Sequence, residues 1–261
     1  MPTLSYAFSS DPSVGAINIR NDGSSFSVAL DTPINIPKGS KDCVVELLQA
    51  SIWNTSPNIA TAYGNNMFYI SYNSITYPLT IPDGLYSVGD LNTIVSRLIM
   101  NLGLPSNLIS ISGDSATQKI VISYSLANTR IDFTQPNTIR LVLGFDARLS
   151  PLAGVSTVGY SDFGDSSANF NRINSFFIRS SLVMAGLPIN TFNAGIIASV
   201  PITASPGSQI NYQPTVPISV DGSNLPNSPL QYISFDLLDQ KLRPVNTMSE
   251  CWSIIIHIKF S

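Results

Sequence analysis

The chain has 261 residues, of which 44% are hydrophobic and only 11% are charged, and its formal net charge is −3. A chain of this length can bury a sizeable core, and its balance of 13 basic against 16 acidic residues excludes a general nucleic-acid binder, which needs clustered positive charge. Because charged residues average about 25% in globular proteins, we expect either a neutral polar surface or a surface that other chains cover, and we favour the second.

Strands dominate the first part of the chain. Short β-branched and aromatic runs, separated by Pro, Gly, Asn and Ser, indicate a sandwich or a barrel. Residues 26–30 alternate between apolar and polar side chains, and residues 43–53 predict a longer strand. The face of the longer strand that we expect to be buried consists of Val44, Leu48, Ala50 and Ile52.

A hairpin and a helix follow these strands. Residues 68–79 predict the hairpin, and residues 87–102 predict the one clear helix. Ser87 and Asp90 have the spacing of a capping box. Apolar residues then recur at helical intervals until Gly103 ends the helix.

Beyond the helix the pattern is again that of strands. A short helical turn is expected at residues 138–143, and residues 146–169 form a loop or linker rich in Gly, Ser and Asp. Further strands are predicted at residues 175–184, 196–202, 209–213, 217–220, 232–238 and 252–260. The clearest alternation is in the last of them, whose buried face should consist of Trp252, Ile254, Ile256, Ile258 and Phe260.

This order predicts a mainly β protein with a nested organisation. Residues 25–60 and 170–261 would form one sandwich, and residues 61–145 would form an inserted α+β subdomain that carries the helix. Residues 1–24 would form an N-terminal arm. The alternative, two β domains side by side with a division near residue 150, stays open.

Residues that carry enzyme chemistry are scarce. The single histidine, His257, lies in the last predicted strand without the motifs of a serine triad, so we expect an ordinary strand histidine. Cys43 and Cys251 lie in apolar segments, which predicts two buried free thiols, although a disulfide between them stays open. One histidine and two cysteines far apart in sequence do not suggest a zinc site.

Two pairs of aspartates are weak candidates for a site. Asp162 and Asp165 could help to bind a hard cation, but a spaced series of ligands is missing, and a polar loop is the simpler interpretation. Asp236 and Asp239 could form a carboxylate pair, but the end of a strand and the turn after it fit better. The sequence therefore predicts no catalytic, cofactor-binding or metal-binding residue, and we expect a protein that is not an enzyme.

The sequence also bears on membranes and secretion. Residues 1–10 lack the basic start of a signal peptide. No segment reaches the ~18 apolar residues that a membrane span requires. We therefore expect neither feature, and a chain that is made and assembled in a cytoplasm.

Several segments together resemble a known family. They are residues 31–34 with 44–55, residues 66–70 with 81–87, residues 175–183, and residues 233–239 with 252–256. In order and spacing these segments resemble the penton (vertex) capsid proteins of virophages, polinton-like viruses and related jelly-roll double-stranded DNA viruses. The resemblance extends over residues 25–260.

The resemblance implies a non-enzymatic virion structural protein with a jelly-roll sandwich, located in the capsid after synthesis in the host cytoplasm. Five copies would close each fivefold vertex of an icosahedral shell beside the major capsid protein, and the insertion would face outward, where it can contact a host receptor. A trimer is the alternative assembly. Two other functions stay open: a major capsid protein, and a spike- or fibre-type module that binds a receptor or glycan through exposed aromatic residues such as Tyr63, Tyr77 and Tyr160.

Overall fold

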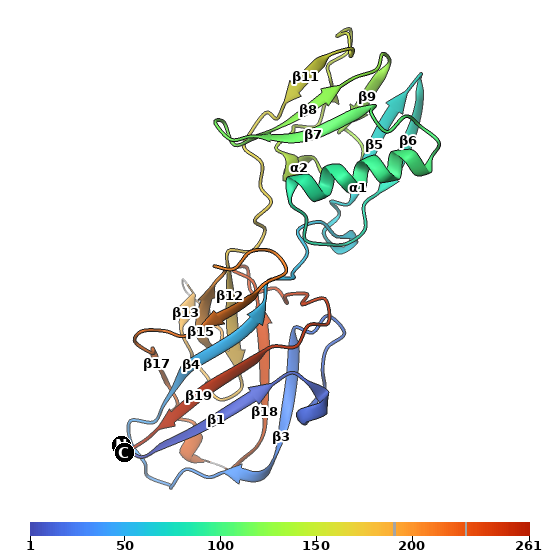
Figure 1. The fold of residues 1–261 in the computed structure, drawn as a ribbon. Coiled ribbons are helices and arrows are strands. Elements are labelled where there is room, and N and C mark those ends of the chain that lie inside the picture. Colours follow the sequence, from blue (N-terminus) through green and yellow to red (C-terminus); the bar gives the residue numbers. More distant parts are fainter. Residues whose placement is uncertain (190–191, 228) are drawn as a thin grey trace. The chain divides into compact units, whose positions relative to one another are not determined.

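The computed structural model describes residues 1–189, 192–227 and 229–261 and divides the chain into two compact units (Figure 1). The first, the sandwich unit, contains Met1–Ser56 and Ile173–Ser261. The second, the inserted unit, is Pro57–Arg172 and interrupts the first once. Its bounds are wider than the 61–145 expected from sequence, because residues on both sides of that range pack into it.

Nearly all of the regular elements in the sandwich unit are strands. Its elements are β1 (Thr3–Ser9), η1 (Pro12–Val14), β2 (Ala16–Ile17), β3 (Ser25–Ile34), β4 (Val44–Trp53), β12 (Ser175–Ser180), β13 (Pro188–Ile189), β14 (Phe192–Asn193), β15 (Ile196–Pro201), β16 (Gln209–Tyr212), β17 (Ser219–Asp221), η3 (Leu225–Asn227), β18 (Leu230–Leu238) and β19 (Ser253–Lys259).

Two antiparallel sheets form the sandwich. One has the order β1-β19-β4, with β16 and β17 along the far edge of β4, and the other has the order β15-β12-β18-β3-β2. If the two-residue strand β2 is left aside and β16 and β17 are taken as one position, the chain visits the sheets in the sequence first, second, first, second, second, first, second, first. This is the connectivity of an eight-stranded jelly roll.

The core lies between the two sheets. The alternation expected in β19 is confirmed for Trp252, Ile254, Ile256 and Ile258, which are all buried, whereas Phe260, just after the strand, is only half-buried. Aromatic rings join the layers: the ring of Phe8 on β1 lies 4.9 Å from that of Phe235 on β18. Burial of each large apolar side chain contributes about 1.5–3 kcal/mol, so this interface supplies most of the stability of the unit.

The buried face of β4 differs from the one predicted. Val45, Leu47, Ala50 and Ile52 face the core, whereas Val44 and Leu48 are only half-buried. A bulge in β4 at Leu48 accounts for the difference, because the consecutive β19 residues Ile255 and Ile256 pair with Gln49 and Leu47. Such a bulge moves one part of a strand to the opposite face, which strict alternation cannot anticipate.

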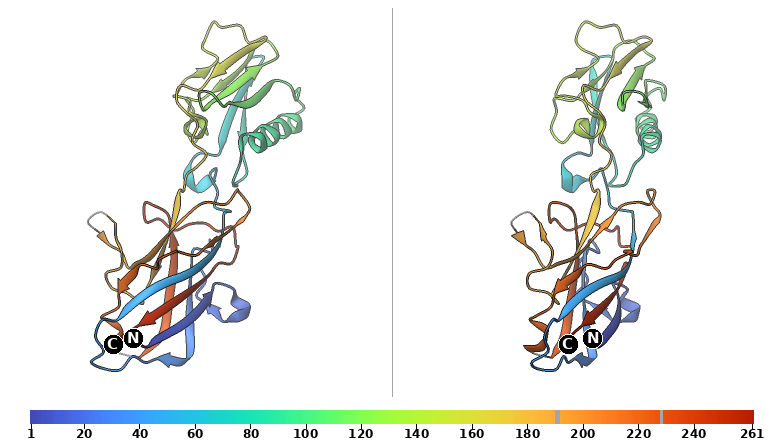
Figure 2. Two further views of the ribbon diagram at one scale, coloured as in Figure 1. Left: turned by 60° about the vertical axis from the view of Figure 1, so that its left-hand side comes forward. Right: turned by 90° about the vertical axis from the view of Figure 1, so that its left-hand side faces the viewer.

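The N-terminal segment is not the arm that was expected. Thr3–Ser9 pairs with β19 along its whole length, and β2 pairs with β3. Residues 1–24 therefore contribute an outer strand to each sheet. Figure 2 shows the N- and C-terminal ends beside each other at one end of the unit.

The inserted unit combines one long helix with two small sheets. Its elements are η2 (Thr61–Tyr63), β5 (Met67–Tyr72), β6 (Ile75–Thr80), α1 (Val88–Asn101), β7 (Ile109–Asp114), β8 (Lys119–Tyr124), β9 (Thr129–Asp132), α2 (Arg140–Leu143), β10 (Leu149–Ser150) and β11 (Tyr160–Phe163). The sheets have the orders β10-β9-β5-β6 and β11-β8-β7.

The helix and the hairpin of this unit follow the sequence signals. The Ser87 hydroxyl accepts a hydrogen bond from the backbone of Asp90, and the Asp90 carboxylate accepts one from the backbone of Ser87, which completes the predicted capping box. The apolar face of α1 packs on β7 and β6. Between β5 and β6, Asn73 and Ser74 both have positive φ, at 48° and 67°, as a tight hairpin turn requires.

The predicted loop at 146–169 is structured. Leu149–Ser150 pairs with β9, and Tyr160–Phe163 pairs with β8 over four residues. These strands are too short for their own sequence to indicate them, because their neighbours in the sheet hold them in place.

The two ends of the inserted unit lie together. The side-chain amide nitrogen of Asn58 donates to the carbonyl oxygens of Tyr86, at 2.8 Å, and Phe170, at 3.1 Å. The side-chain oxygen of Asn58 accepts a hydrogen bond from the backbone N–H of Tyr86 at 2.9 Å. One buried asparagine thus joins the entry and the exit of the unit.

Candidate functional site: the two flanks of the sandwich

The sandwich unit has two flanks at which its sheets end. On one, the outermost strands are β1 in the first sheet and β2 in the second; on the other, they are β16 and β17 in the first and β15 in the second. Figure 1 shows β13, β15 and β17 on the opposite side of the unit from β3. Edge strands carry backbone groups without a partner, so these flanks are where such a unit can join another chain.

Over residues 180–220 the β15 flank carries no charge, and the first charged residue after them is Asp221, at the end of β17. We call residues 180–220 the charge-free flank, because this whole stretch contains no Asp, Glu, Lys, Arg or His. At the chain's own share of 11% charged residues, a stretch of that length would carry about four or five. Met184, Val216 and Ile218 are exposed on it. A surface of this kind can be covered without removing water from any ion.

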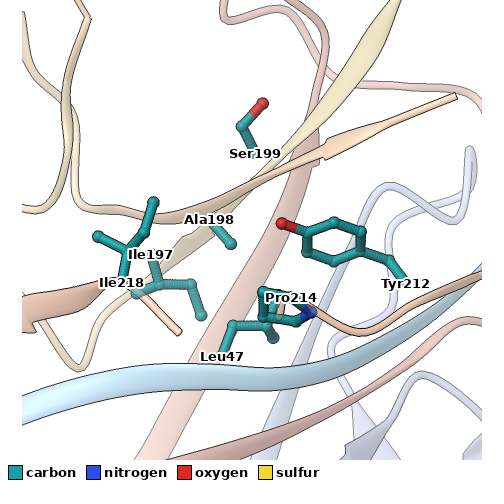
Figure 3. A pocket seen from close by; sticks show the side chains of 7 residues that line it. All are labelled: Leu47, Ile197, Ala198, Ser199, Tyr212, Pro214 and Ile218. Carbon is teal, nitrogen blue, oxygen red and sulfur yellow. The ribbon is translucent and has the colours of Figure 1, made fainter. Parts of the chain in front are cut away.

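An apolar hollow opens on the charge-free flank, where β15 of one sheet approaches β4 of the other (Figure 3). It contains about 310 Å³ of empty space, part of which is open to solvent. Its lining comes from β4, β15, β16 and the segment after β16, through Leu47, Ile197, Ala198, Ser199, Tyr212, Pro214 and Ile218.

The hollow has a local cause in the pairing of β4. β16 pairs with Ala50–Trp53, and β17 pairs with Val44–Glu46. The segment 213–218 between them contains Pro214 and Pro217, and proline cannot donate to a ladder. The chain therefore leaves the edge of β4 beside Leu47, and a gap remains.

An ion pair fixes the base of this flank. The buried carboxylate of Glu46 accepts hydrogen bonds from Lys259 Nζ at 2.7 Å and from the Ser219 hydroxyl, on β17, at 2.6 Å. Burial acts to raise the pKa of Glu46, but these two hydrogen bonds and the charge of Lys259 outweigh it and hold that pKa below its ordinary value. The carboxylate thus ties β17 and β19 to β4.

The opposite flank presents an unprotected edge. β1 pairs with β19 over seven residues without a register shift, and within the described ranges no strand lies on its other side. Its sequence, Thr3–Ser9, contains neither a charge nor a proline, the residues that usually protect an edge. η1 follows, capped by the Asp11 carboxylate, which accepts from the Ser13 backbone at 2.8 Å. Val14, at its end, is 68% exposed.

The strongest cluster of charges lies in the inserted unit and serves its own packing. Arg148 contacts Asp162 at 2.7 Å and Asp165 at 2.9 Å. The Ser150 hydroxyl donates to Asp162 at 2.7 Å, and the Tyr124 hydroxyl donates to the Ser150 carbonyl oxygen at 2.7 Å. The carboxylate oxygens that a cation would need are thus directed at a guanidinium group and a hydroxyl.

The electrostatics of this cluster favour a fixed protonation state. Burial raises the pKa of Tyr124, which therefore remains a hydrogen-bond donor at neutral pH. The hydrogen bond to Asp162 raises the pKa of Arg148 further above its ordinary value. Burial acts to raise the pKa of Asp165, but the hydrogen bond from Arg148 outweighs it, and the net shift is downward.

The other aspartates singled out in the sequence do not meet. Asp236 contacts Arg179 at 2.9 Å, whereas Asp239 is buried and contacts Arg243 at 2.6 Å. The Asp239 carboxylate also accepts from the backbone of Lys241 and Arg243, so it shapes the turn after β18.

The three tyrosines proposed as exposed ligand contacts are half-buried instead. Tyr77 and Tyr160 pack against the core of the inserted unit. The guanidinium of Arg172 lies 3.6 Å from the centre of the Tyr63 ring, a cation–π contact.

The cysteines and the histidine occupy different environments. Both cysteines are free, and Cys43 is buried as predicted, with its pKa raised by burial and by Asp221. Cys251 is exposed, which corrects the prediction: it precedes β19 and lies outside the alternation of that strand. His257 is a half-buried residue of β19 opposite Glu46.

Sequence reasoning missed both flanks as surfaces. The absence of charge over 180–220 can be read directly from the sequence and was the available signal. The hollow could not be found that way, because it depends on how β16 and β17 share the edge of β4.

Two further searches concern metals and membranes. Over residues 1–189, 192–227 and 229–261, no cluster of three or more His, Cys, Asp or Glu side chains is placed to hold a metal ion. None of the helices in the described part of the chain has the length and apolar character to cross a bilayer.

Comparisons with known proteins gave matches among solved structures. The crystal structure of the mavirus penton protein matches over 100% of both chains, with 10% sequence identity and a TM-score of 0.48. A chain of the cryo-EM structure of the Sputnik virophage matches over 98% of this chain and 97% of its own length, with 14% identity and a TM-score of 0.43. No family model and no curated protein matches the sequence.

Proposed function

We propose that this chain is a structural protein of a virion shell and that its copies close the fivefold vertices of an icosahedral capsid. The observation that carries the proposal is a jelly roll whose two open flanks have different shapes and carry little charge. A closed ring joins one flank of each copy to the opposite flank of the next, so it needs two different surfaces that are both easily desolvated.

The inserted unit fits the same proposal. It enters between β4 and β12, two strands of the roll, and has its own core and its own buried charge network. It would supply the outward part of the vertex and any contact with a host surface. The remaining faces of the sandwich unit would meet the major capsid protein.

The native mass of the full chain tests the proposal. We expect native mass spectrometry of the purified protein to give about 140 kDa, five times the 28.1 kDa of one copy. Negative-stain images should show rings with fivefold symmetry. A stable trimer would favour a spike or a major capsid protein, and a monomer that is also absent from purified particles would overturn the proposal.

A further inference from the structure

Within residues 1–189, 192–227 and 229–261, the hollow on the charge-free flank is left open by the protein's own side chains. Its lining is largely apolar, and one of the lining residues, Ile218, is exposed (Figure 3). Apolar concavities of this kind on a globular protein mark a binding surface. The question is which occupant fits it.

The absence of charge restricts the occupant. No side chain between residues 180 and 220 can form an ion pair with a phosphate, a carboxylate or an ammonium group. A charged ligand would lose its hydration here without compensation, at a large energetic penalty. The part of the occupant that enters the hollow must therefore be uncharged and largely apolar.

The opposite flank of the same unit has these properties. β1 is uncharged over its whole length and offers a free edge, and η1 presents Val14 to solvent. An edge with neither charge, proline nor bulge invites pairing and aggregation when it is left open. The presence of such an unprotected edge on β1 is explained if a second copy covers it in the assembled state.

The two surfaces are also connected by one line of cross-strand neighbours, a row, in the first sheet. Tyr6 of β1 pairs with Ile256 of β19, and Ile256 pairs with Leu47, which lines the hollow. The middle of β1 and the hollow thus occupy the two ends of a single row across the sheet. Rotation about a ring axis requires the two contact surfaces of a copy to stand at one height, and a shared row favours that arrangement.

We propose that the hollow of each copy receives the β1–η1 segment of a second copy, with Val14 as the side chain that enters it. The contact is head-to-tail: residues 3–14 of one copy cover the charge-free flank of the next, whose own residues 3–14 remain available to a third. This inference rests on the proposed function, since it describes how copies in a vertex ring meet.

Disulfide trapping tests the contact directly. In a Cys251→Ser background, Val14→Cys and Ile218→Cys are made as separate full-length proteins; both positions are exposed, and Cys43 is buried. Under mild oxidation we expect a covalent dimer only when the two variants are mixed. The double variant should give a ladder that ends in a closed covalent ring.

Charge insertion gives a second readout. Val14→Lys and Ile218→Lys should each lower the association constant at least 10-fold by native mass, because a lysine must be buried in an apolar contact. The matched control is Tyr232→Lys, which changes an equally exposed residue, 64% accessible, on the central strand β18, and should leave the mass unchanged.

The possible outcomes separate the two proposals. A disulfide formed by Ile218→Cys or Val14→Cys alone would mean a symmetric contact and overturn the inference. The wild type could be oligomeric while the two cysteine variants do not cross-link in the mixture and the lysine variants associate as strongly as the wild type. That result would overturn the inference and leave the vertex function intact. A wild type that is monomeric and absent from particles, with no cross-link in the mixture, would overturn both.

Discussion

At the scale of single residues, the buried charges of this protein are engaged within their own unit. Glu46 joins β4 to β17 and β19, and Arg148 joins β10 to β11 and its following turn. Ionised Glu46 accepts hydrogen bonds and ionised Arg148 donates them, which is why these groups are tolerated in a chain with so few charges.

Glu46 makes the stability of the sandwich unit dependent on pH. Its pKa is lower in the folded protein than in the unfolded chain, so its contribution is complete above the unfolded pKa, near 4.5, and is lost as the pH falls through the folded value. Glu46→Gln should lower the free energy of unfolding by about 1–2 kcal/mol at pH 7. The difference from the wild type should shrink below pH ~4.

Urea unfolding at a fixed protein concentration measures this difference. Both tryptophans, Trp53 and Trp252, lie in the sandwich unit, so their fluorescence reports on that unit. Glu250→Gln, at an exposed site, is the control and should show no such convergence. A difference between Glu46→Gln and the wild type that grows on acidification would contradict the assignment.

The Arg148 network predicts a local loss of stability. Arg148→Ala would leave Asp162 buried without its counter-ion, which should destabilise the inserted unit by about 3 kcal/mol. Hydrogen exchange should then quicken in β8 and β11 but not in β18 and β19. Arg97→Ala, at an exposed position of α1, should change exchange little, and equal effects of the two variants would contradict the prediction.

At the scale of elements, local patterns predicted what local forces determine. The cap and apolar face of α1 and the alternation of β19 are encoded within a few residues, and both are confirmed. β1 was missed because its partner, β19, lies at the far end of the chain. The buried face of β4 was missed because of a bulge at Leu48, which becomes visible only in the pairing of β4 with β19. The flanks were missed for the same reason, since they exist only once distant strands are paired.

The β5–β6 turn offers a stabilising change. Ser74 has a φ of 67°, a left-handed conformation that disfavours a residue with a Cβ by about 1 kcal/mol. Ser74→Gly should therefore stabilise the hairpin by about 0.5 kcal/mol, after allowance for the greater freedom of glycine when unfolded. Protection of the hairpin amides against exchange measures the gain. Ser71→Gly, within β5, should lower that protection. Lower protection in both glycine variants would refute the prediction.

At the scale of the whole molecule, an assembly through charge-free flanks should be indifferent to salt. Screening weakens contacts between charges but leaves apolar contacts intact. We expect the dissociation midpoint of the oligomer to stay within about 3-fold between ~0.05 and ~0.5 M NaCl, and to fall when sulfate is added, because sulfate strengthens apolar association. Dissociation that rises steeply with NaCl would indicate ion pairs at the contact instead.

The way in which Asn58 closes the inserted unit has an evolutionary consequence. With its entry and exit held together by one side chain, the unit is attached to the roll as a loop is, and its interior can change length or sequence while the strands on either side keep their pairing. Under the proposed function, mutations within the insertion need not disturb the flanks on which copies would meet. The sequence of the insertion could therefore diverge rapidly while the flanks of the sandwich unit are conserved.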